Sequence, residues 1–176
     1  MTAQKYFDYS FKHNKYEKDF FTNKTNQYAY DISIHKNFNQ NIFLFGPRKS
    51  GKSLLINLWK TINNGFLYNN NFAEVIKFKH NICIDDALTS LEEEQLFHII
   101  NHCKLYNLKI FLTSSIDLNH FNFKFKDLYS RLRSFYYLDI KSPDEEMCKM
   151  LMIKFFSNKQ IIIKNNEIFD FIFKRI

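Results

Sequence analysis

Short apolar runs alternate with longer amphipathic stretches along the chain, and several of the runs end in small or acidic residues. Such runs are typical of buried parallel strands, whereas apolar positions spaced three and four residues apart indicate helices. The runs that predict strands are 42–45, 66–68, 82–84, 109–112 and 135–140. Alternating strands and helices predict an α/β fold with a parallel sheet, in which ligands bind at the carboxyl ends of the strands.

Local signals indicate where the helices between these strands begin. One helix follows Ser53 and ends at the Asn-Asn-Gly stretch that comes after it. The capping box Ser90-x-x-Glu93 predicts the start of a second helix. Ser142, followed by proline and then by acidic residues, predicts the N-cap of a third. Residues 71–78 are ambiguous between helix and strand.

The composition narrows the class of protein. A chain of 176 residues with 45% hydrophobic residues has enough apolar material for one folded domain and is not disordered. Three widely spaced cysteines without a C-x-x-C pair favour a reducing, cytoplasmic location and argue against disulfides or zinc. No apolar run reaches the ~18 residues of a membrane span. The net charge of +7 accompanies abundant Asn, Lys, Ile, Phe and Tyr, a bias typical of AT-rich genomes, so it is weak evidence for a nucleic-acid partner.

Residues 46–53 match the phosphate-binding pattern G-x-x-x-x-G-K-[ST] at every fixed position, between an apolar run and an amphipathic helix. Glycines let backbone N–H groups surround a phosphate, Lys52 reaches the β and γ phosphates, and the Ser53 hydroxyl binds Mg²⁺. The alternative is a glycine turn with an exposed lysine. The residues predicted to bind nucleotide are Gly46, Pro47, Arg48, Lys49, Ser50, Gly51, Lys52, Ser53 and Leu54.

Two other predicted strands end in polar side chains suited to the same site. Asp85 follows the run at 82–84 and would bind the metal together with Ser53, while Asp86 would orient water. The alternative is an ordinary strand end with solvated acids. Ser114, in the Thr-Ser-Ser stretch after the next run, would lie beside the γ-phosphate and the attacking water. A hydroxyl-rich turn is the alternative there.

Arg131 and Arg133 lie just before the last predicted strand. An arginine at such a place can act in trans as a finger that neutralises charge on a phosphoryl group held by a neighbouring subunit. A solvated basic turn is the alternative, and it is the favoured interpretation for Arg133. His98 and His102 have a spacing that can bind metal, but no ligand partner lies nearby in the sequence, which favours a solvated helix face.

These motifs, in this order, resemble the DnaA-related family of AAA+ P-loop ATPases, and the closer likeness is to its shorter Hda-type members, the regulatory inactivators of DnaA. The stretches that carry the resemblance are 19–21, 46–59, 82–86, 94–101, 110–114 and 127–132. The resemblance implies a three-layer AAA+ core at 32–141. Residues 1–31 are polar and aromatic without a clear period, which predicts an irregular N-terminal arm with one short helix. The resemblance also implies the start of a small helical lid at 142–176.

The resemblance also implies roles for particular residues. Arg131 falls at the arginine-finger position, from which Hda-type proteins promote hydrolysis of DnaA-bound ATP and prevent re-initiation of replication. Hda-type proteins begin with a peptide of the form Gln-x-x-Leu-x-Leu that binds the DNA sliding clamp, and Gln4, Phe7 and Tyr9 occupy its anchor places. A chance match is the alternative for so short a peptide, which spans residues 4–9.

The ligands that the resemblance implies are ADP or ATP with Mg²⁺, and the partners are DnaA and the sliding clamp. A homo-oligomer is left open, and direct DNA binding is expected to be weak or absent. The sequence has no room for the partner-binding and DNA-binding regions of DnaA, which favours a regulator. The lid arginine of AAA+ proteins would follow 174–176, so we expect weak or no intrinsic ATPase. The alternative is an autonomous ATPase of the DnaA or helicase-loader type.

Overall fold

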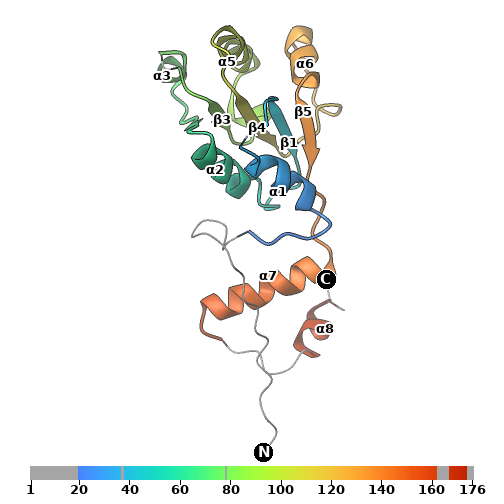
Figure 1. Cartoon of the computed structure of the whole chain (residues 1–176). Coiled ribbons are helices and arrows are strands. Elements are labelled where there is room, and N and C mark those ends of the chain that lie inside the picture. The colour runs from blue at the N-terminus through green and yellow to red at the C-terminus, as the bar shows by residue number, and fades with distance from the viewer. Residues whose placement is uncertain (1–19, 37, 78, 162–166, 174–176) are drawn as a thin grey trace, which may run out of the picture.

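The computed structural model describes residues 20–36, 38–77, 79–161 and 167–173. Figure 1 shows its strands side by side with helices around them, and α7 and α8 lie at one end of this body. The helices are α1 Gln27–Ile34, α2 Lys52–Ile62, α3 Phe72–Lys77, α4 Ala87–Ser90, α5 Glu93–Leu105, α6 Lys126–Arg133, α7 Glu145–Asn158 and α8 Glu167–Phe173. The strands are β1 Ile42–Phe45, β2 Phe66–Leu67, β3 Ile82–Ile84, β4 Ile110–Ser114 and β5 Tyr136–Asp139. Among these helices, none is both long and apolar enough to cross a membrane.

The strands form one parallel sheet in the order β2-β3-β4-β1-β5. In its register, Phe45 at the end of β1 lies opposite Ser114 at the end of β4 and Asp139 at the end of β5. The carboxyl ends of the strands therefore meet at one edge of the sheet. We call it the carboxyl edge, and the opposite one the amino edge.

Helices cover both faces of the sheet, because successive residues of a strand point to opposite sides. The strand side chains buried toward α1 and α2 are Ile42, Leu44, Cys83, Phe111 and Leu138. Those buried toward α3, α5 and α6 are Phe43, Ile82, Ile84, Ile110 and Leu112. This helix–sheet–helix arrangement confirms the three-layer P-loop architecture predicted from the sequence.

The start of α5 differs from the prediction. Ser90 is the last residue of α4, and the N-cap of α5 is Glu92, which makes no side-chain cap hydrogen bond. The Glu93 carboxylate does not close a capping box with Ser90. Instead it accepts hydrogen bonds from the backbone N–H groups of Lys124 and Phe125, at 3.1 and 2.9 Å. The predicted capping box is therefore wrong, because Glu93 holds the entrance of a different helix, α6.

The start of α7 is also shifted. Its N-cap is Asp144, whose carboxylate accepts a hydrogen bond from the backbone N–H of Met147 at 2.9 Å, so the prediction of Ser142 was wrong. The same carboxylate accepts a hydrogen bond from the Asn23 side chain at 2.8 Å and lies 3.3 Å from the Lys24 ammonium. Asp144 therefore joins α7 to the segment that precedes α1.

Two further stretches acquire definite structure. The ambiguous residues 71–78 contain the helix α3. Helix α1 crosses residue 31, the expected end of the N-terminal arm, and its Ala29 is 1% exposed within the core beside α2. The described end of the arm thus contributes to the core of the α/β unit.

Candidate nucleotide-binding site

The loop between β1 and α2 has the backbone that its glycines permit. Gly51 adopts φ +97°, and a Cβ atom there would lie only 2.7 Å from Cε2 of Phe20. Side chains rarely tolerate either condition, so this position favours glycine on two independent grounds. The Gly46 N–H donates to the Ser114 carbonyl at 3.2 Å, which attaches the start of the loop to the end of β4.

Lys52, the first residue of α2, is folded into this loop. Its side chain is buried, and its ammonium donates to the carbonyls of Gly46 at 2.7 Å and Pro47 at 2.8 Å. Burial lowers the pKa of Lys52, although the nearby carboxylates of Asp86 and Asp85 counteract that effect. The loop thus holds a desolvated cation among backbone groups, where a phosphate would find strong attraction.

The predicted metal ligands lie together at the carboxyl edge. The Ser53 hydroxyl donates to one Asp85 carboxylate oxygen at 2.6 Å, and the Thr113 hydroxyl donates to the other at 2.5 Å. Hydroxyl and carboxylate oxygens are the ligands that Mg²⁺ takes from proteins beside a bound phosphate. Three segments far apart in the sequence, the P-loop, the end of β3 and the end of β4, therefore converge on Asp85.

Ser114 does not face this cluster. Its side chain is fully buried, and its hydroxyl donates to the Ile116 carbonyl at 2.7 Å and accepts from the Ile116 N–H at 2.9 Å. The hydroxyl beside Asp85 is that of Thr113, which the sequence interpretation did not select. The strand period could have shown this, because Thr113 shares a face of β4 with Phe111, which packs against Trp59 of α2 at 5.5 Å.

Asp86 follows Asp85 in the left-handed backbone region, with φ +50° and ψ +48°. Its carboxylate accepts hydrogen bonds from the Ser115 N–H at 2.7 Å and from the hydroxyls of Ser115 and Thr89 at 2.8 Å each. Burial alone would raise the pKa of Asp86. The hydrogen bonds from Thr89 and Ser115, with the charge of Lys52, outweigh burial and hold the pKa below its usual value.

The residues present fit a nucleotide phosphate and its Mg²⁺. The Ser50 hydroxyl oxygen is buried in the loop, and no hydrogen-bond partner for it exists among the described residues. Buried polar atoms in native proteins nearly always have partners, so an unpaired hydroxyl inside a phosphate-type loop is consistent with a ligand there. Lys52, Ser53 and Asp85 supply the charge and the hard oxygen donors that such a ligand requires.

A small hollow of about 110 Å³ lies beside the loop. The residues that line it are Phe20, Phe21, Thr22, Asn23, Glu146, Met147 and Met150. Phe20 forms one wall, stacks on Tyr30 with centroids 5.4 Å apart, and reaches Gly51 of the P-loop. The hollow therefore combines aromatic and thioether surfaces next to the phosphate loop, between the segment before α1 and the helix α7.

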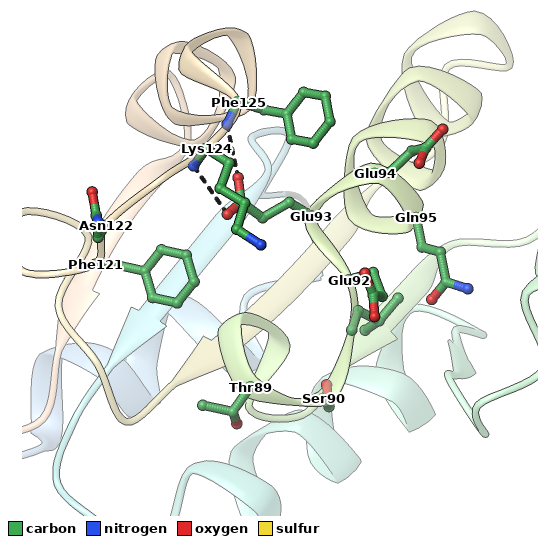
Figure 2. A pocket seen from close by; sticks show the side chains of 11 residues that line it. Thr89, Ser90, Glu92, Glu93, Glu94, Gln95, Phe121, Asn122, Lys124 and Phe125 are labelled. Atoms are coloured by element: carbon green, nitrogen blue, oxygen red, sulfur yellow. Dashed lines mark hydrogen bonds between the residues drawn. The ribbon is translucent and has the colours of Figure 1, made fainter.

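A larger hollow of about 540 Å³ lies where α4, α5 and the segment before α6 meet. Figure 2 shows Glu92, Glu93 and Glu94 on one side and Phe121 and Phe125 on the other, with the Glu93 carboxylate bridging them. Sequence reasoning did not anticipate this hollow, because its two walls lie about 30 residues apart in the sequence.

Arg131 lies in the last turn of α6, close to the amino end of β5, whereas the P-loop begins at the carboxyl end of β1 (Figure 1). A four-residue strand spans roughly 13 Å, so the backbone at the end of α6 and the start of the P-loop lie toward opposite ends of these strands. The Arg131 guanidinium sits 4.8 Å above the Phe97 ring, and Arg133 sits 5.8 Å from the Tyr129 ring. The Arg131 side chain thus packs on an aromatic ring of α5.

Gln4, Phe7 and Tyr9 lie outside the described residues. His98 lies 3.9 Å from Glu94, and His102 is buried against Tyr106. In the described part of the chain, no three His, Cys, Asp or Glu side chains gather as a metal site would require.

Comparison with known proteins identifies the fold. No protein-family model matches the sequence, and no curated protein matches it either. Solved structures do match, and one is a replication initiator DnaA bound to AMPPCP and single-stranded DNA. It shares 16% sequence identity with a TM-score of 0.74, covering 90% of this chain and 59% of that one. The chain thus spans about three-fifths of the length of that protein.

Two other solved structures are similar. Domain III of the Thermotoga maritima replication initiation protein DnaA matches with a TM-score of 0.72 and 18% identity, covering 88% of this chain and 78% of that one. DnaI matches with a TM-score of 0.54 and 18% identity, covering 73% of this chain and 88% of that one. At these identities the likeness shows the fold alone, which is that of an AAA+ P-loop NTPase domain.

Proposed function

We propose that the chain is a nucleotide-binding regulator of replication initiation, related to DnaA and of the Hda type. In this proposal it binds ADP or ATP with Mg²⁺ at the carboxyl edge and has weak intrinsic ATPase activity. It donates Arg131 to ATP held by DnaA and attaches to the sliding clamp through Gln4, Phe7 and Tyr9. The observation that best supports this proposal is the position of Arg131 in the last turn of α6, where its guanidinium rests on the Phe97 ring rather than on a residue of the P-loop.

The residues at the carboxyl edge have assigned parts in this proposal. The P-loop backbone and Lys52 would hold the phosphates, and Ser53 and Asp85 would hold Mg²⁺, which neutralises phosphate charge when bound. The hollow between Phe20 and Met147 would take the base, because it adjoins the loop and offers apolar surfaces for stacking. Ser114 would support the cluster through the Gly46 contact, and Thr113 would stand beside the phosphate.

The regulatory part is tested by following hydrolysis of DnaA-bound ATP in the presence of clamp loaded on DNA. Wild-type protein should accelerate hydrolysis, and Arg131→Ala should remove at least about tenfold of that effect, since finger residues contribute far more than that elsewhere. Arg133→Ala is the matched control, because it lies in the same helical turn over another aromatic ring. No acceleration by the wild type, or equal losses in both variants, would contradict the proposal.

The clamp part is tested by capture of the protein on immobilised sliding clamp. Gln4→Ala combined with Phe7→Ala should abolish capture, because these side chains are the anchors of the proposed peptide. Lys5→Ala is the control, since it lies between the anchors in the same peptide. If the anchor variant is captured on the clamp as well as the wild type is, the proposed clamp binding through Gln4 and Phe7 is wrong.

The second candidate is an autonomous ATPase of the DnaA or helicase-loader type. It is supported by the match to DnaI, in which 88% of that chain shares this fold. This candidate requires intrinsic turnover of ATP that Lys52→Ala abolishes, without any need for DnaA. Turnover that appears only when DnaA is present would favour the regulator.

A further inference from the structure

Asp86 has the place of a water-orienting acid, but its surroundings hold it firmly. Its backbone occupies the left-handed region, which residues other than glycine rarely adopt. Its N–H donates to the Thr113 hydroxyl at 2.8 Å, and its carbonyl accepts from the N–H groups of Thr89 and Ser90 at 2.9 and 3.0 Å. The main chain of Asp86 is therefore fixed from both β4 and α4.

The Asp86 carboxylate is fixed as well. One oxygen accepts the Ser115 N–H at 2.7 Å and the Ser115 hydroxyl at 2.8 Å, and the other accepts the Thr89 hydroxyl at 2.8 Å. A carboxylate offers about four lone-pair positions, so three protein hydrogens occupy most of its capacity. These donors come from α4 and from the segment after β4, on two sides of the side chain.

An acid that orients water needs a free lone pair within hydrogen-bonding distance of that water. In ATP hydrolysis the water oxygen bonds to the γ-phosphorus while the bond from that phosphorus to the bridging oxygen breaks. ADP leaves with the electron pair, and the proton of the attacking water passes to an acceptor. A carboxylate that already accepts three protein hydrogens is poorly placed to receive it.

We propose that Thr89 and Ser115 are positioning residues that restrain Asp86 and thereby keep intrinsic ATP hydrolysis slow. This inference rests on the proposed function, because it needs ATP at the P-loop. Asp85 makes the useful contrast. The hydroxyls that donate to its carboxylate, those of Ser53 and Thr113, belong to the metal and phosphate site, so these hydrogen bonds shape that site rather than withdraw a carboxylate from it.

The test is single-turnover hydrolysis of MgATP, measured together with MgATP affinity. The double variant Thr89→Val with Ser115→Ala should hydrolyse ATP about tenfold faster, since it frees the carboxylate of two hydroxyl donors. Affinity should stay within about twofold, because neither hydroxyl contacts Lys52 or Asp85 in the described network. The conservative pair Thr89→Ser with Ser115→Thr keeps both hydroxyls and should retain the wild-type rate.

Two controls connect the effect to Asp86. Adding Asp86→Asn to the double variant should remove the gain in rate. Ser90→Ala should leave the hydrolysis rate unchanged, because the Ser90 hydroxyl, which lies in the same helix as Thr89, donates to the backbone carbonyl of Asp85 and not to the Asp86 carboxylate. If the double variant folds poorly, Thr89→Val alone provides the test. Thr89 is exposed on the wall shown in Figure 2, and its substitution should give a smaller gain in hydrolysis rate than the double variant.

The outcomes separate the two proposals. A wild type that does not bind MgATP overturns the proposed function and this inference together. A wild type that binds, with a double variant that hydrolyses no faster, overturns this inference alone. So does a gain that persists after Asp86→Asn, because the restraint would then not act through Asp86.

Discussion

The two edges of the sheet carry charge in different ways. At the carboxyl edge, Lys52, Asp85 and Asp86 are each bound by backbone or hydroxyl groups at 2.5–2.8 Å. Toward the amino edge, the last turn of α6 carries Arg131, whose guanidinium rests on the Phe97 ring, and no carboxylate among the described residues forms an ion pair with it.

This difference is the one expected between a preformed ligand-binding site, here at the carboxyl edge, and a side chain that acts on a ligand held by another protein, here Arg131. A closed network fixes its atoms in advance, which suits a ligand of defined geometry such as a metal-bound phosphate. A guanidinium on an aromatic face keeps its N–H donors available for an anion on another molecule.

Removing the Lys52 ammonium should have the largest effect. Lys52→Ala should weaken binding of a fluorescent ATP analogue by about 100-fold, because charge-assisted hydrogen bonds to phosphate contribute up to about 3 kcal/mol. Lys60→Ala, at the far end of the same helix, is the control and should bind normally. Equal affinity of the Lys52 variant and wild type for the analogue would show that the nucleotide does not bind at the carboxyl edge.

Adding a methyl group at Gly51 should have the next largest effect. Gly51→Ala should destabilise the fold by about 1–3 kcal/mol, because it combines a strained positive φ with a clash against Phe20. Denaturant midpoints measure the loss. If the clash contributes, a Phe20→Leu background should recover part of it, and full retention of stability in Gly51→Ala would contradict the loop geometry.

The Thr113 and Ser114 hydroxyls offer a finer comparison. Thr113→Val should lower MgATP affinity by roughly fivefold, or about 1 kcal/mol, while leaving metal-free nucleotide binding unchanged, because the Thr113 hydroxyl, unlike that of Ser114, donates to the Asp85 carboxylate. Ser114→Ala should alter the metal dependence less, since its hydroxyl engages Ile116. A larger effect for Ser114 in calorimetric titrations would reinstate the sequence prediction.

The smallest effect concerns the attachment of α7 at Asp144. A hydrogen bond from the Met147 N–H, assisted by Lys24 and Asn23 against some desolvation, holds the pKa of Asp144 below its usual value. A lowered pKa means that this contribution is complete above about pH 4 and is lost as the pH falls through the folded-state pKa. Urea midpoints of wild type and Asp144→Asn should therefore differ at pH 6 and converge in acid. A difference between the two urea midpoints that does not change with pH would contradict a stabilising role for the charged Asp144 carboxylate.

The sequence predicted the sheet because each central strand is buried on both faces and therefore appears as a continuous apolar run. Local helix starts were harder to predict. Ser142 and Asp144 are both good capping residues, and the choice between them depends on Asn23 and Lys24, which are distant in sequence. Glu93 likewise serves a neighbouring helix instead of its own.

The P-loop could be found in the sequence because its chemistry requires a fixed spacing, and Asp85 could be found because it directly follows an apolar strand run. Alternation along β4 distinguishes Thr113 from Ser114 once it is known that the face of β4 with Phe111 packs against α2. The restraint on Asp86 depends on Ser115 and Thr89 meeting in space, and no local pattern encodes that meeting.

The separation of the two edges is tested most directly by the MgATP affinity of Arg131→Ala, measured beside Lys52→Ala in the same titration. The account predicts that Arg131→Ala binds MgATP as the wild type does, while Lys52→Ala loses binding. A loss in Arg131→Ala as large as that in Lys52→Ala would show that Arg131 serves the chain's own nucleotide site, and would contradict the account.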